Sequence, residues 1–493
     1  MKHPEDRPSS SGASQDLPEI DPNRPASPGK PQRLLLGWLF MTLMATELLA
    51  RMTDNNVAQT GAWVAMAAVI LASARKIGLR EVYLLCLSAV LSWAVWQFSP
   101  TPQQDLAGAL SQATFLMAFI LLLGLLHEAA GSSPSVEALG RFLARQPAGR
   151  RFYALFSGSG IMSILFNLGV VSFLVPLIQR GIRSTDPTDP LNPIRERRQV
   201  SALLRGFAWC VIWSPTAVAP LALLELIPDV DRKLWILIGF LLFLLFMVVG
   251  AIEDRVRFRA YRPRAKQQRP IFPRMATAKF ALACGWLFGP SILISNLLDE
   301  TIIFGLMATC PLMLVGWLVV QNWNGGKVDL VPVGRRLKEI ALDSIPQSAR
   351  VAVTLGCSGF IGRAGSALVP ADDVAQALGL ANIPDFLLLS ALPPLLASMS
   401  LFGLSPIMTA VFFGSFFGKL PVMPTDPTLL ALSISMGWAM SILLSPLATP
   451  VLMINRVGGY APTTLTWRWN LLYGVLSMLA AVPIFALLTT IVG

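Results

Sequence analysis

Two Ser-Pro pairs interrupt apolar stretches of this chain at corresponding places. Residues 206–217 are GFAWCVIWSPTA and residues 437–448 are GWAMSILLSPLA, so a glycine, an alanine, the Ser-Pro pair and a final alanine recur in register. A proline lacks a backbone donor and frees the carbonyl one turn before it. Freed carbonyls can coordinate a cation, and the N-termini of half-helices attract an anion. The candidate solute- or ion-binding residues at these breaks are Ser214, Pro215, Thr216, Ser445, Pro446 and Thr449.

Two other apolar stretches, 152–181 and 384–420, are each long enough for two half-crossings of a membrane and are broken near the middle. The breaks predict the tips of two re-entrant hairpins. Asn167 offers both a donor and an acceptor between apolar neighbours, and an unpartnered amide at the bilayer midplane costs a few kcal/mol. Its partner is either a solute or ion, or a backbone carbonyl of the opposing hairpin. The candidate binding residues at the tips are Asn167, Gly169, Ser405, Pro406 and Thr409.

Ionisable residues inside apolar stretches are functional candidates by default. Arg363 lies just before Ala364-Gly365 and towards the second hairpin, and it is a further binding candidate. Near a helix end, such groups usually extend to the interface. We therefore expect interfacial positions for Glu47, Glu128 and Glu225 and a simple anchoring role for Arg205.

The composition is that of an integral membrane protein. Of 493 residues, 54% are hydrophobic and only 14% are charged, and the mean hydropathy is +0.60; ordinary globular domains have about 25% charged residues. Apolar stretches long enough to cross about 30 Å of hydrocarbon recur along most of the chain. With no Walker loop, paired catalytic carboxylates or nucleophile triad, the sequence favours neither an enzyme nor an ATP-driven pump. Five cysteines in apolar stretches and two histidines predict no metal site, disulfide framework or other cofactor.

The net charge of +11 lies in short segments between apolar stretches, which indicates cytoplasmic loops facing anionic lipid and not a nucleic-acid partner. Threading these segments inside predicts an all-α polytopic membrane protein with about eleven transmembrane helices. These are 34–50, 57–74, 82–98, 109–127, 200–224, 233–252, 277–297, 301–322, 347–365, 428–454 and 468–492.

The same threading divides the chain into five parts. A disordered cytoplasmic tail (1–33) precedes a leading transmembrane helix (34–50). The first repeat (57–252) carries the cytoplasmic-side hairpin 152–181, the basic loop 253–276 follows, and the second repeat (277–492) carries the outer-side hairpin 384–420. We expect a multi-pass protein of a bacterial-type inner membrane with a cytoplasmic N-terminus.

The two halves match at intervals of 234, 236 and 231 residues, at Ala130/Ala364, Leu165/Leu401 and Gly206/Gly437. The threading gives the matched segments opposite directions. Inverted repeats with broken elements in corresponding positions are typical of secondary transporters and mark the binding site.

This arrangement resembles the ion transporter superfamily, and most closely its divalent-anion:sodium symporter branch. That branch carries Ser-Asn-Thr at each hairpin tip and a proline nine residues beyond the first asparagine. Asn167 and Pro176 match this pattern, whereas Phe166 and Leu168 replace the serine and threonine, and the second tip is Gly403-Leu404-Ser405-Pro406. The resemblance implies two five-helix inverted repeats and alternating access of the elevator type, with Na+ as a candidate coupling ion.

The sequence therefore predicts a secondary active transporter of a small, anionic organic solute, coupled to Na+ or H+. The expected partners are the solute and the lipid bilayer, and a homodimer is left open. Two alternatives stay open: a cation/proton antiporter on the same fold, which requires a deep carboxylate, and a non-transport membrane component of an envelope assembly or polymer export system.

Overall fold

The computed structural model describes residues 30–53, 55–131, 133–183, 188–261, 270–324 and 327–492, and most of these residues are helical. A single pair of two-residue strands, β1 (Trp323–Asn324) and β2 (Lys327–Val328), is the exception among these residues. The prediction of an all-α polytopic membrane protein is confirmed. Most of the predicted tail lies outside the described residues, as do 262–269 of the predicted basic loop.

Nine helical segments of the described chain are long and apolar enough to cross a membrane, or ten when the bent pair Leu330–Ala367 and Ala371–Ala377 counts as one span. They are built from α1 (Lys30–Thr53), α2 (Asn56–Ser73), α3 (Leu79–Phe98), α4 (Pro102–Gly131), α10 (Arg232–Arg257), α11 (Arg274–Leu298), α12 (Ile302–Gln321), α18 (Pro427–Leu444) with α19 (Thr449–Gly458), and η4 (Thr464–Asn470) with α20 (Leu471–Val492). The bent pair contains α13 (Leu330–Glu339), η1 (Ile340–Ser344), η2 (Ile345–Ser348), α14 (Ala349–Ala367) and α15 (Ala371–Ala377). The remaining predicted span, 200–224, is divided between two shorter helices.

The division falls at the first Ser-Pro pair, between α8 (Asn192–Cys210) and α9 (Val218–Leu226). The Ser214 amide still donates to the Cys210 carbonyl (2.8 Å), and the Ala217 amide donates to the Ser214 carbonyl (3.0 Å). Pro215 has no amide hydrogen to continue the helix and disfavours helical geometry at the residue before it. The pattern repeats between α18 and α19, where Ser445 donates to Ser441 (2.9 Å) and Ala448 donates to Ser445 (3.1 Å). Both prolines thus end a helix and do not merely bend it.

Two pairs of short helices occupy the stretches predicted as hairpins. The first pair is α6 (Ala148–Phe166) and α7 (Gly169–Arg183), and the second is α16 (Asp385–Leu401) and α17 (Pro406–Phe417). Each tip reverses the chain through one residue with positive φ, Asn167 (46°) in the first and Gly403 (89°) in the second. These two residues are 236 apart, which is also the interval between the matched leucines upstream. The two tips therefore bend at equivalent positions.

The helices of the two halves pack in matching pairs. Within the first half α6 packs on α8, and within the second half α16 packs on α18. Between the halves, α7 packs on α19, and the equivalent contact is that of α17 on α9. The contact of α3 with α14 corresponds in the same way to the contact of α12 with α4. Matched glycines allow the closest of these approaches. A Cβ at Gly206 would lie 2.0 Å from the Phe156 carbonyl oxygen on α6, and one at Gly437 would lie 2.9 Å from the Leu396 Cβ on α16. Small residues at such contacts let helix backbones come together inside a membrane.

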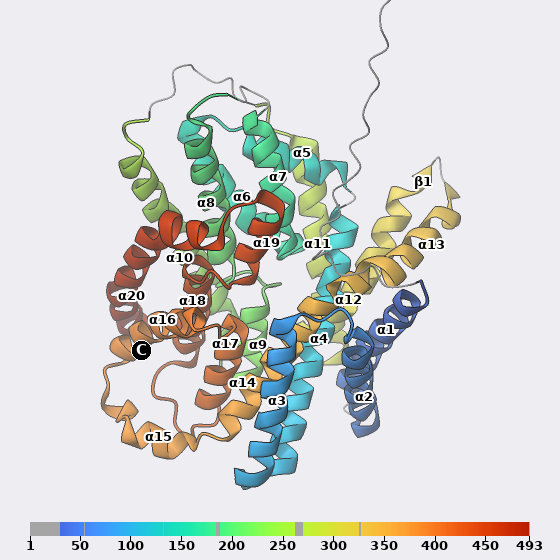
Figure 1. Cartoon of the computed structure of the whole chain (residues 1–493), viewed down its shortest axis with the longest axis vertical. Coiled ribbons are helices and arrows are strands. Elements are labelled where there is room, and N and C mark those ends of the chain that lie inside the picture. Colours follow the sequence, from blue (N-terminus) through green and yellow to red (C-terminus); the bar gives the residue numbers. More distant parts are fainter. Residues whose placement is uncertain are drawn as a thin grey trace, which may run out of the picture.

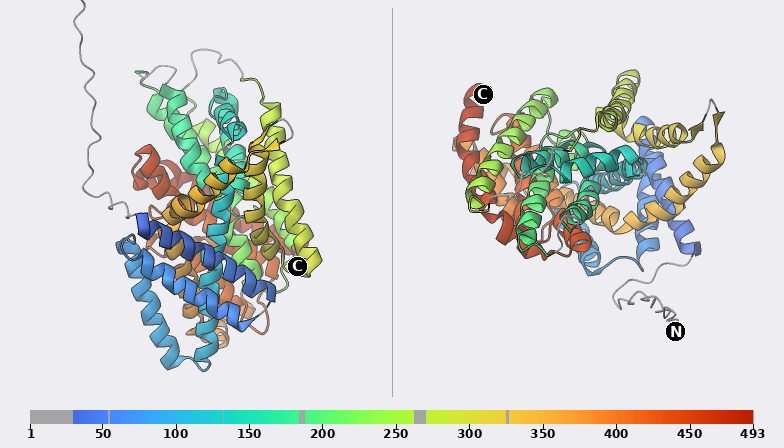
Figure 2. Two further views of the ribbon diagram at one scale, coloured as in Figure 1. Left: turned by 90° about the vertical axis from the view of Figure 1, so that its right-hand side faces the viewer. Right: turned by 90° about the horizontal axis from the view of Figure 1, so that it is seen from above.

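Figures 1 and 2 show two groups of helices. The hairpins, α8, α10 and α18–α20 lie on one side, and α1–α3 with α11–α13 lie on the other. The long helix α4 contacts both groups, since it packs on α1, α3 and α12 and also on α6 and α9, and α14 packs on α4 and on α17. The short helix α5 (Pro134–Ala144) packs on α6, α7 and α11, and η3 (Leu380–Asn382) follows α15.

Arg205 holds one of these groups together, so the expectation of a simple anchor was wrong. Its side chain is 2% exposed and donates to Glu253 on α10 (2.8 Å) and to Asn470 of η4 (2.8 Å). The guanidinium also lies over the Tyr473 ring, 4.1 Å from its centroid. Arg205 therefore joins the interrupted helix α8 to α10 and α20 through buried, fully oriented contacts.

The basic and acidic connections predicted for opposite faces lie at opposite ends of the molecule. In Figure 1 the end of α10 and the start of α11 lie in the upper part, and α15 lies at the bottom. The connection between α10 and α11 carries the predicted cytoplasmic arginines, and α15 carries Asp372 and Asp373.

We predict that a single cysteine replacing Gln376 in α15 reacts with a membrane-impermeant thiol reagent in intact cells, whereas one replacing Ala260 after α10 is protected until the cells are opened. Arginine-rich connections are retained on the cytoplasmic side, which fixes the orientation. The background should lack all five native cysteines, because Cys86 is exposed. Labelling of the Ala260 position and protection of the Gln376 position would invert the orientation proposed here.

Candidate functional site

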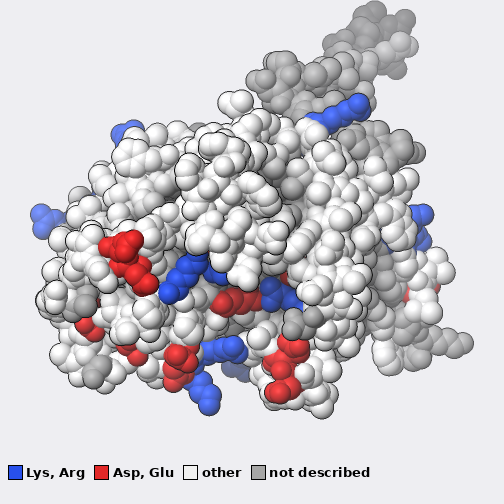
Figure 3. Space-filling model, turned by 90° about the horizontal axis from the view of Figure 1, so that it is seen from below, with Lys and Arg blue, Asp and Glu red and all other residues white. Residues whose placement is uncertain are grey.

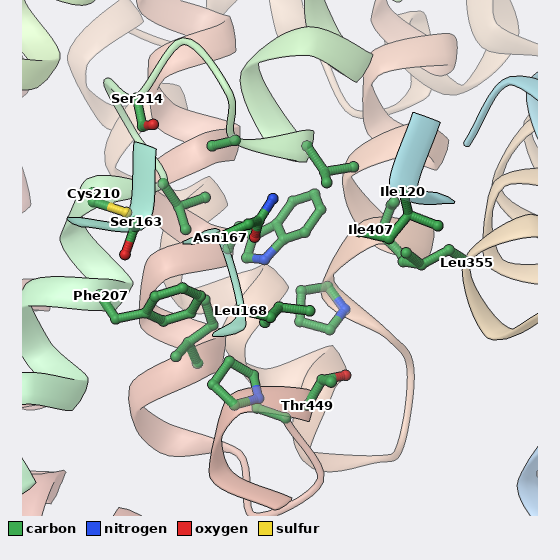
Figure 4. Close-up of a pocket in the computed structure, with 18 of the residues that line it drawn as sticks. Ile120, Ser163, Asn167, Leu168, Phe207, Cys210, Ser214, Leu355, Ile407 and Thr449 are labelled. Atoms are coloured by element: carbon green, nitrogen blue, oxygen red, sulfur yellow. The ribbon is translucent and has the colours of Figure 1, made fainter. Parts of the chain in front are cut away.

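A cavity of about 80 Å³ lies where the two hairpin tips meet the two helix breaks (Figure 4). One water molecule needs about 10–15 Å³ of such space, so the cavity has room for several waters or a small solute. Its walls come from α4, both tips, both breaks and α14, and they are mostly apolar.

Ten of the nineteen lining residues form corresponding pairs from the two halves of the chain. The two residues of each of four pairs are 231 positions apart in the sequence. A fifth pair, Ile120 on α4 and Leu355 on α14, is 235 positions apart. The four pairs are Phe207/Trp438, Val211/Ile442, Ala217/Ala448 and Val218/Thr449. The cavity therefore lies between equivalent parts of the two halves.

Four helices begin at the wall of this cavity. The residues that precede or open α7, α9, α17 and α19 all line it, namely Leu168, Ala217, Ser405 and Ala448. Each helix N-terminus carries a partial positive charge of about half an elementary charge and directs unpaired amides outward. None of the described residues that line the cavity is charged, so no carboxylate offsets these helix ends. An anion is the ligand that this electrostatic arrangement favours.

The cavity also receives the C-terminal end of one helix. Cys210 and Val211, where α8 ends, both line it. Carbonyl oxygens at such an end carry partial negative charge and suit a cation. Anion and cation sites can therefore be adjacent here.

Asn167 supplies the only side-chain amide in the described lining, and four hydroxyl residues join it: Ser163, Ser214, Ser405 and Thr449. Figure 4 shows Asn167 and Leu168 between Phe207 on one side and Ile407 and Leu355 on the other. The Asn167 Nδ2 donates to the Thr216 carbonyl at 3.4 Å, a long hydrogen bond. Its protein partner thus comes from the break in its own half, and not from the opposing hairpin.

Of the twelve sequence-predicted residues, five line the cavity: Asn167, Ser214, Ser405, Pro406 and Thr449. Two others brace it from behind. The Thr216 hydroxyl donates to the Ile164 carbonyl (2.9 Å), and the Ser445 hydroxyl donates to the Ser400 carbonyl (2.9 Å). Each ties a break to the hairpin arm beside it. Pro215 and Pro446 set the breaks themselves.

The other three candidates lie away from the lining. Gly169 faces His127, whose Nδ1 would be 2.2 Å from a Cβ added at that glycine. The Thr409 hydroxyl donates to the Pro406 carbonyl within its own helix (3.0 Å). Arg363 belongs to a separate charged group on the side of α15.

That group joins three helices. Arg363 lies beside Gly108 of α4, where its Nε would be 3.6 Å from an added Cβ, and it acts electrostatically on Asp105 and Lys419. The Lys419 Nζ is 3.9 Å from the Asp105 Oδ1, and Ser99 donates to the same carboxylate. Figure 3, which views the molecule from this end, shows basic and acidic side chains gathered near the middle of the face.

The apolar lining, including Ile120, Leu355, Phe207 and Trp438, was not predicted from the sequence. Identical residues alone revealed the repeat, whereas these pairs are similar and not identical. Applying the 231-residue interval to every position of 206–217 would have found the pairs at the breaks.

No family model matches the chain, and no curated protein matches it in sequence. Its fold is similar to the crystal structure of the YdaH transporter of Alcanivorax borkumensis, described as having an unusual topology. The superposition has a TM-score of 0.50 at 14% sequence identity and covers 83% of this chain and 98% of that chain. At this identity the likeness shows a shared fold.

We predict that Asn167→Gly leaves the thermal stability of the ligand-free protein equal to wild type or higher, whereas Asn167→Ala lowers it. Asn167 has φ 46° and ψ −128°, which glycine adopts freely and alanine does not. A residue with a Cβ in such a sparsely populated conformation costs about 1–3 kcal/mol. Thermal unfolding of the purified variants in one detergent checks this. Equal losses in both variants would mean that the amide, and not the backbone conformation, stabilises the tip.

Proposed function

We propose that this chain is a secondary active transporter that moves a small, anionic organic solute across the membrane, coupled to a gradient of Na+ or H+. The observation that carries the proposal is the uncharged cavity between the two halves, lined by corresponding residues and surrounded by four helix N-termini. Helices interrupted at membrane depth are tolerated where the broken backbone lines a cavity, and in transporters such breaks form the solute site.

The solute's charge follows from the helix ends. One helix N-terminus stabilises an anion by about 0.3–1 kcal/mol at an exposed site and by up to about 2 kcal/mol in a partly buried one. Four together supply several kcal/mol towards desolvating a carboxylate. Asn167, Ser405 and Thr449 add hydrogen-bonding groups, and the apolar walls suit an organic body.

The proposed transport cycle is of the elevator type, with the two halves arranged as inverted repeats. The matched helix contacts support this arrangement, because exchanging the equivalent helices of the two halves converts each contact into its counterpart. The hairpins and interrupted helices would move as one unit against α1–α3 and α11–α13. The solved structure of similar fold is that of a protein named as a transporter, which agrees with such a role. We place the protein in an inner membrane with its N-terminus in the cytoplasm.

A cation/proton antiporter on the same fold requires a deep carboxylate at its ion site, and the deep carboxylates Glu47 and Glu225 lie outside the cavity. The described lining residues include no carboxylate, so the anion transporter is the better account.

We expect proteoliposomes containing the protein to take up at least one member of a panel of labelled organic carboxylates, and Ala448→Trp to reduce that uptake at least about tenfold. Ala448 lines the cavity, so an indole there occupies the solute's space. A tenfold loss corresponds to about 1.4 kcal/mol. Ala89→Trp is the matched control, because Ala89 is exposed on the outward face of α3.

Two results would contradict the proposal. An uptake rate of Ala448→Trp equal to that of the wild type would show that the solute does not pass through the cavity. A protein that binds and transports none of the carboxylates, while remaining folded by size-exclusion chromatography, would favour a non-transport role.

A further inference from the structure

An ionic triad joins the leading helix α1 to the interrupted helix α9, and its side chains are 1% exposed at Glu47, 18% at Glu225 and 24% at Arg51. Arg51 on α1 donates through Nε to the Glu47 Oε1 (3.0 Å) and through Nη1 to the Glu225 Oε1 (2.6 Å). Glu47 is 1% exposed, and the Arg51 guanidinium lies 4.2 Å above the Phe115 ring of α4. Glu47 and Glu225 were expected to be interfacial groups; in the structure both contact Arg51, and the side chain that holds Glu225 is 174 residues away in sequence.

The triad holds two carboxylates and one guanidinium, so it carries one excess negative charge when both carboxylates are ionised. Excess charge in a buried site costs several kcal/mol unless something neutralises it. The groups that act electrostatically on Glu225 are Arg51 and Glu47.

No other charged group of the described chain supplies the missing positive charge. The elements packed on α1 and α9 are α2, α4, α12, α17, α18, η1 and η2. Of these, α2, α12, α17, α18 and η2 contain no charged residue. On α4, Asp105 faces Lys419, Glu128 pairs with Arg336, and His127 lies against Gly169; Asp343 of η1 is exposed.

One oxygen of the triad is left without a partner. Glu47 Oε2 is buried and accepts no hydrogen bond. The Thr114 side chain of α4 lies within reach of Glu47, and its one hydroxyl hydrogen is directed within its own helix, to the carbonyl of Leu110 or of Ser111. While that hydroxyl donates within α4, a protonated Glu47 Oε2 can donate to the Thr114 oxygen, whereas an ionised Oε2 is left without a partner.

A proton suits this position better than a metal cation. Sodium needs several oxygen ligands, and the Arg51 guanidinium, 3.0 Å from Glu47 Oε1, repels any cation placed beside the carboxylate. A proton needs only the one free oxygen. It neutralises the excess charge and keeps the ion pair between Arg51 and Glu225, while Glu47 Oε1 becomes a carbonyl oxygen that still accepts from Arg51 Nε.

We propose that Glu47, Arg51 and Glu225 form a proton-binding site, with the proton on Glu47 Oε2, and that this site makes H+ the ion coupled to transport. The coupling part of the proposal rests on the function proposed above. Glu225 lies on the nine-residue helix α9, whose first residue, Val218, lines the cavity. Helix α9 packs on α17 and α18 and so belongs to the group of helices that contains the hairpins. Glu47 and Arg51 lie on α1, which belongs to the other group. Movement of α9 relative to α1 must separate Glu225 from Arg51. Arg51 and Glu47 then remain together on α1, and their net charge is +1 when Glu47 is protonated and zero when it is ionised.

The proton site is tested first without any solute. Infrared spectra of the protein in nanodiscs are recorded between about pH 9 and about pH 5, a range in which buried glutamates titrate. We expect a carboxylic-acid C=O band that grows as the pH falls, is lost in Glu47→Gln and persists in Glu128→Gln. Glu128 is the matched control, since it is a glutamate paired with an arginine (3.2 Å) outside the triad. Glu225→Gln, which leaves one carboxylate per guanidinium, should also abolish the band.

A pH-dependent band unaffected by both triad variants would overturn the proton site, as would the absence of any such band in the wild type. The wild-type spectrum decides this even if a variant does not fold.

Coupling is tested in proteoliposomes with a labelled carboxylate that the wild type takes up. A pH gradient should accelerate wild-type and Glu128→Gln uptake, and it should lose that effect in Glu47→Gln, which still exchanges labelled for unlabelled solute. Uptake driven by Na+ and insensitive to the pH gradient would refute coupling and leave the proposed function standing. No uptake of any carboxylate, with the infrared band present, would refute the proposed function and leave the proton site standing.

Discussion

A bilayer interior offers no water to a backbone amide or carbonyl, so every interruption of a membrane helix must find protein partners or line a cavity. Four interruptions in the described part of the chain, two at the hairpin tips and two at the Ser-Pro pairs, meet around one cavity. Side-chain hydroxyls satisfy carbonyls at the same places, as Thr216 does for Ile164 and Ser445 for Ser400. The breaks and the cavity thus depend on each other: neither would be tolerated at this depth without the other.

The same constraint gives the cavity its chemistry. Because a helix interrupted by proline presents a new N-terminus to the break, four positive helix ends gather without any charged side chain in the described lining. Charge is instead held at a distance, in the Arg205 contacts between α8, α10 and α20 and in the Glu47–Arg51–Glu225 triad between α1 and α9. The first fixes elements within one group of helices, whereas the second joins elements of different groups. That difference is why the triad, and not Arg205, is the candidate for a proton linked to movement.

Much of this fold was predictable because its signals are local. Apolar length alone located the spans, and proline chemistry located the breaks at Ser214-Pro215 and Ser445-Pro446. The span at 200–224 was predicted as one crossing because its apolar length is sufficient, although Pro215 divides it into α8 and α9.

Other features were not predictable, because they depend on which residues meet in three dimensions. Nothing local distinguishes Ile120 or Leu355 from any other apolar residue of a membrane helix, yet both line the cavity. Arg51 and Glu225 are 174 residues apart, so their ion pair has no signal in either segment. Arg205 likewise resembled an interfacial arginine until Glu253 and Asn470 were seen beside it.

The most direct test of the central claim is to locate the solute in the protein. Crystals soaked with a bromine-labelled organic carboxylate should give an anomalous peak in the cavity between Asn167 and Thr449, and crystals soaked with the corresponding neutral amide should give none there. A carboxylate peak at another place, or equal peaks for the acid and the amide in the cavity, would contradict an anion site formed by the four helix ends.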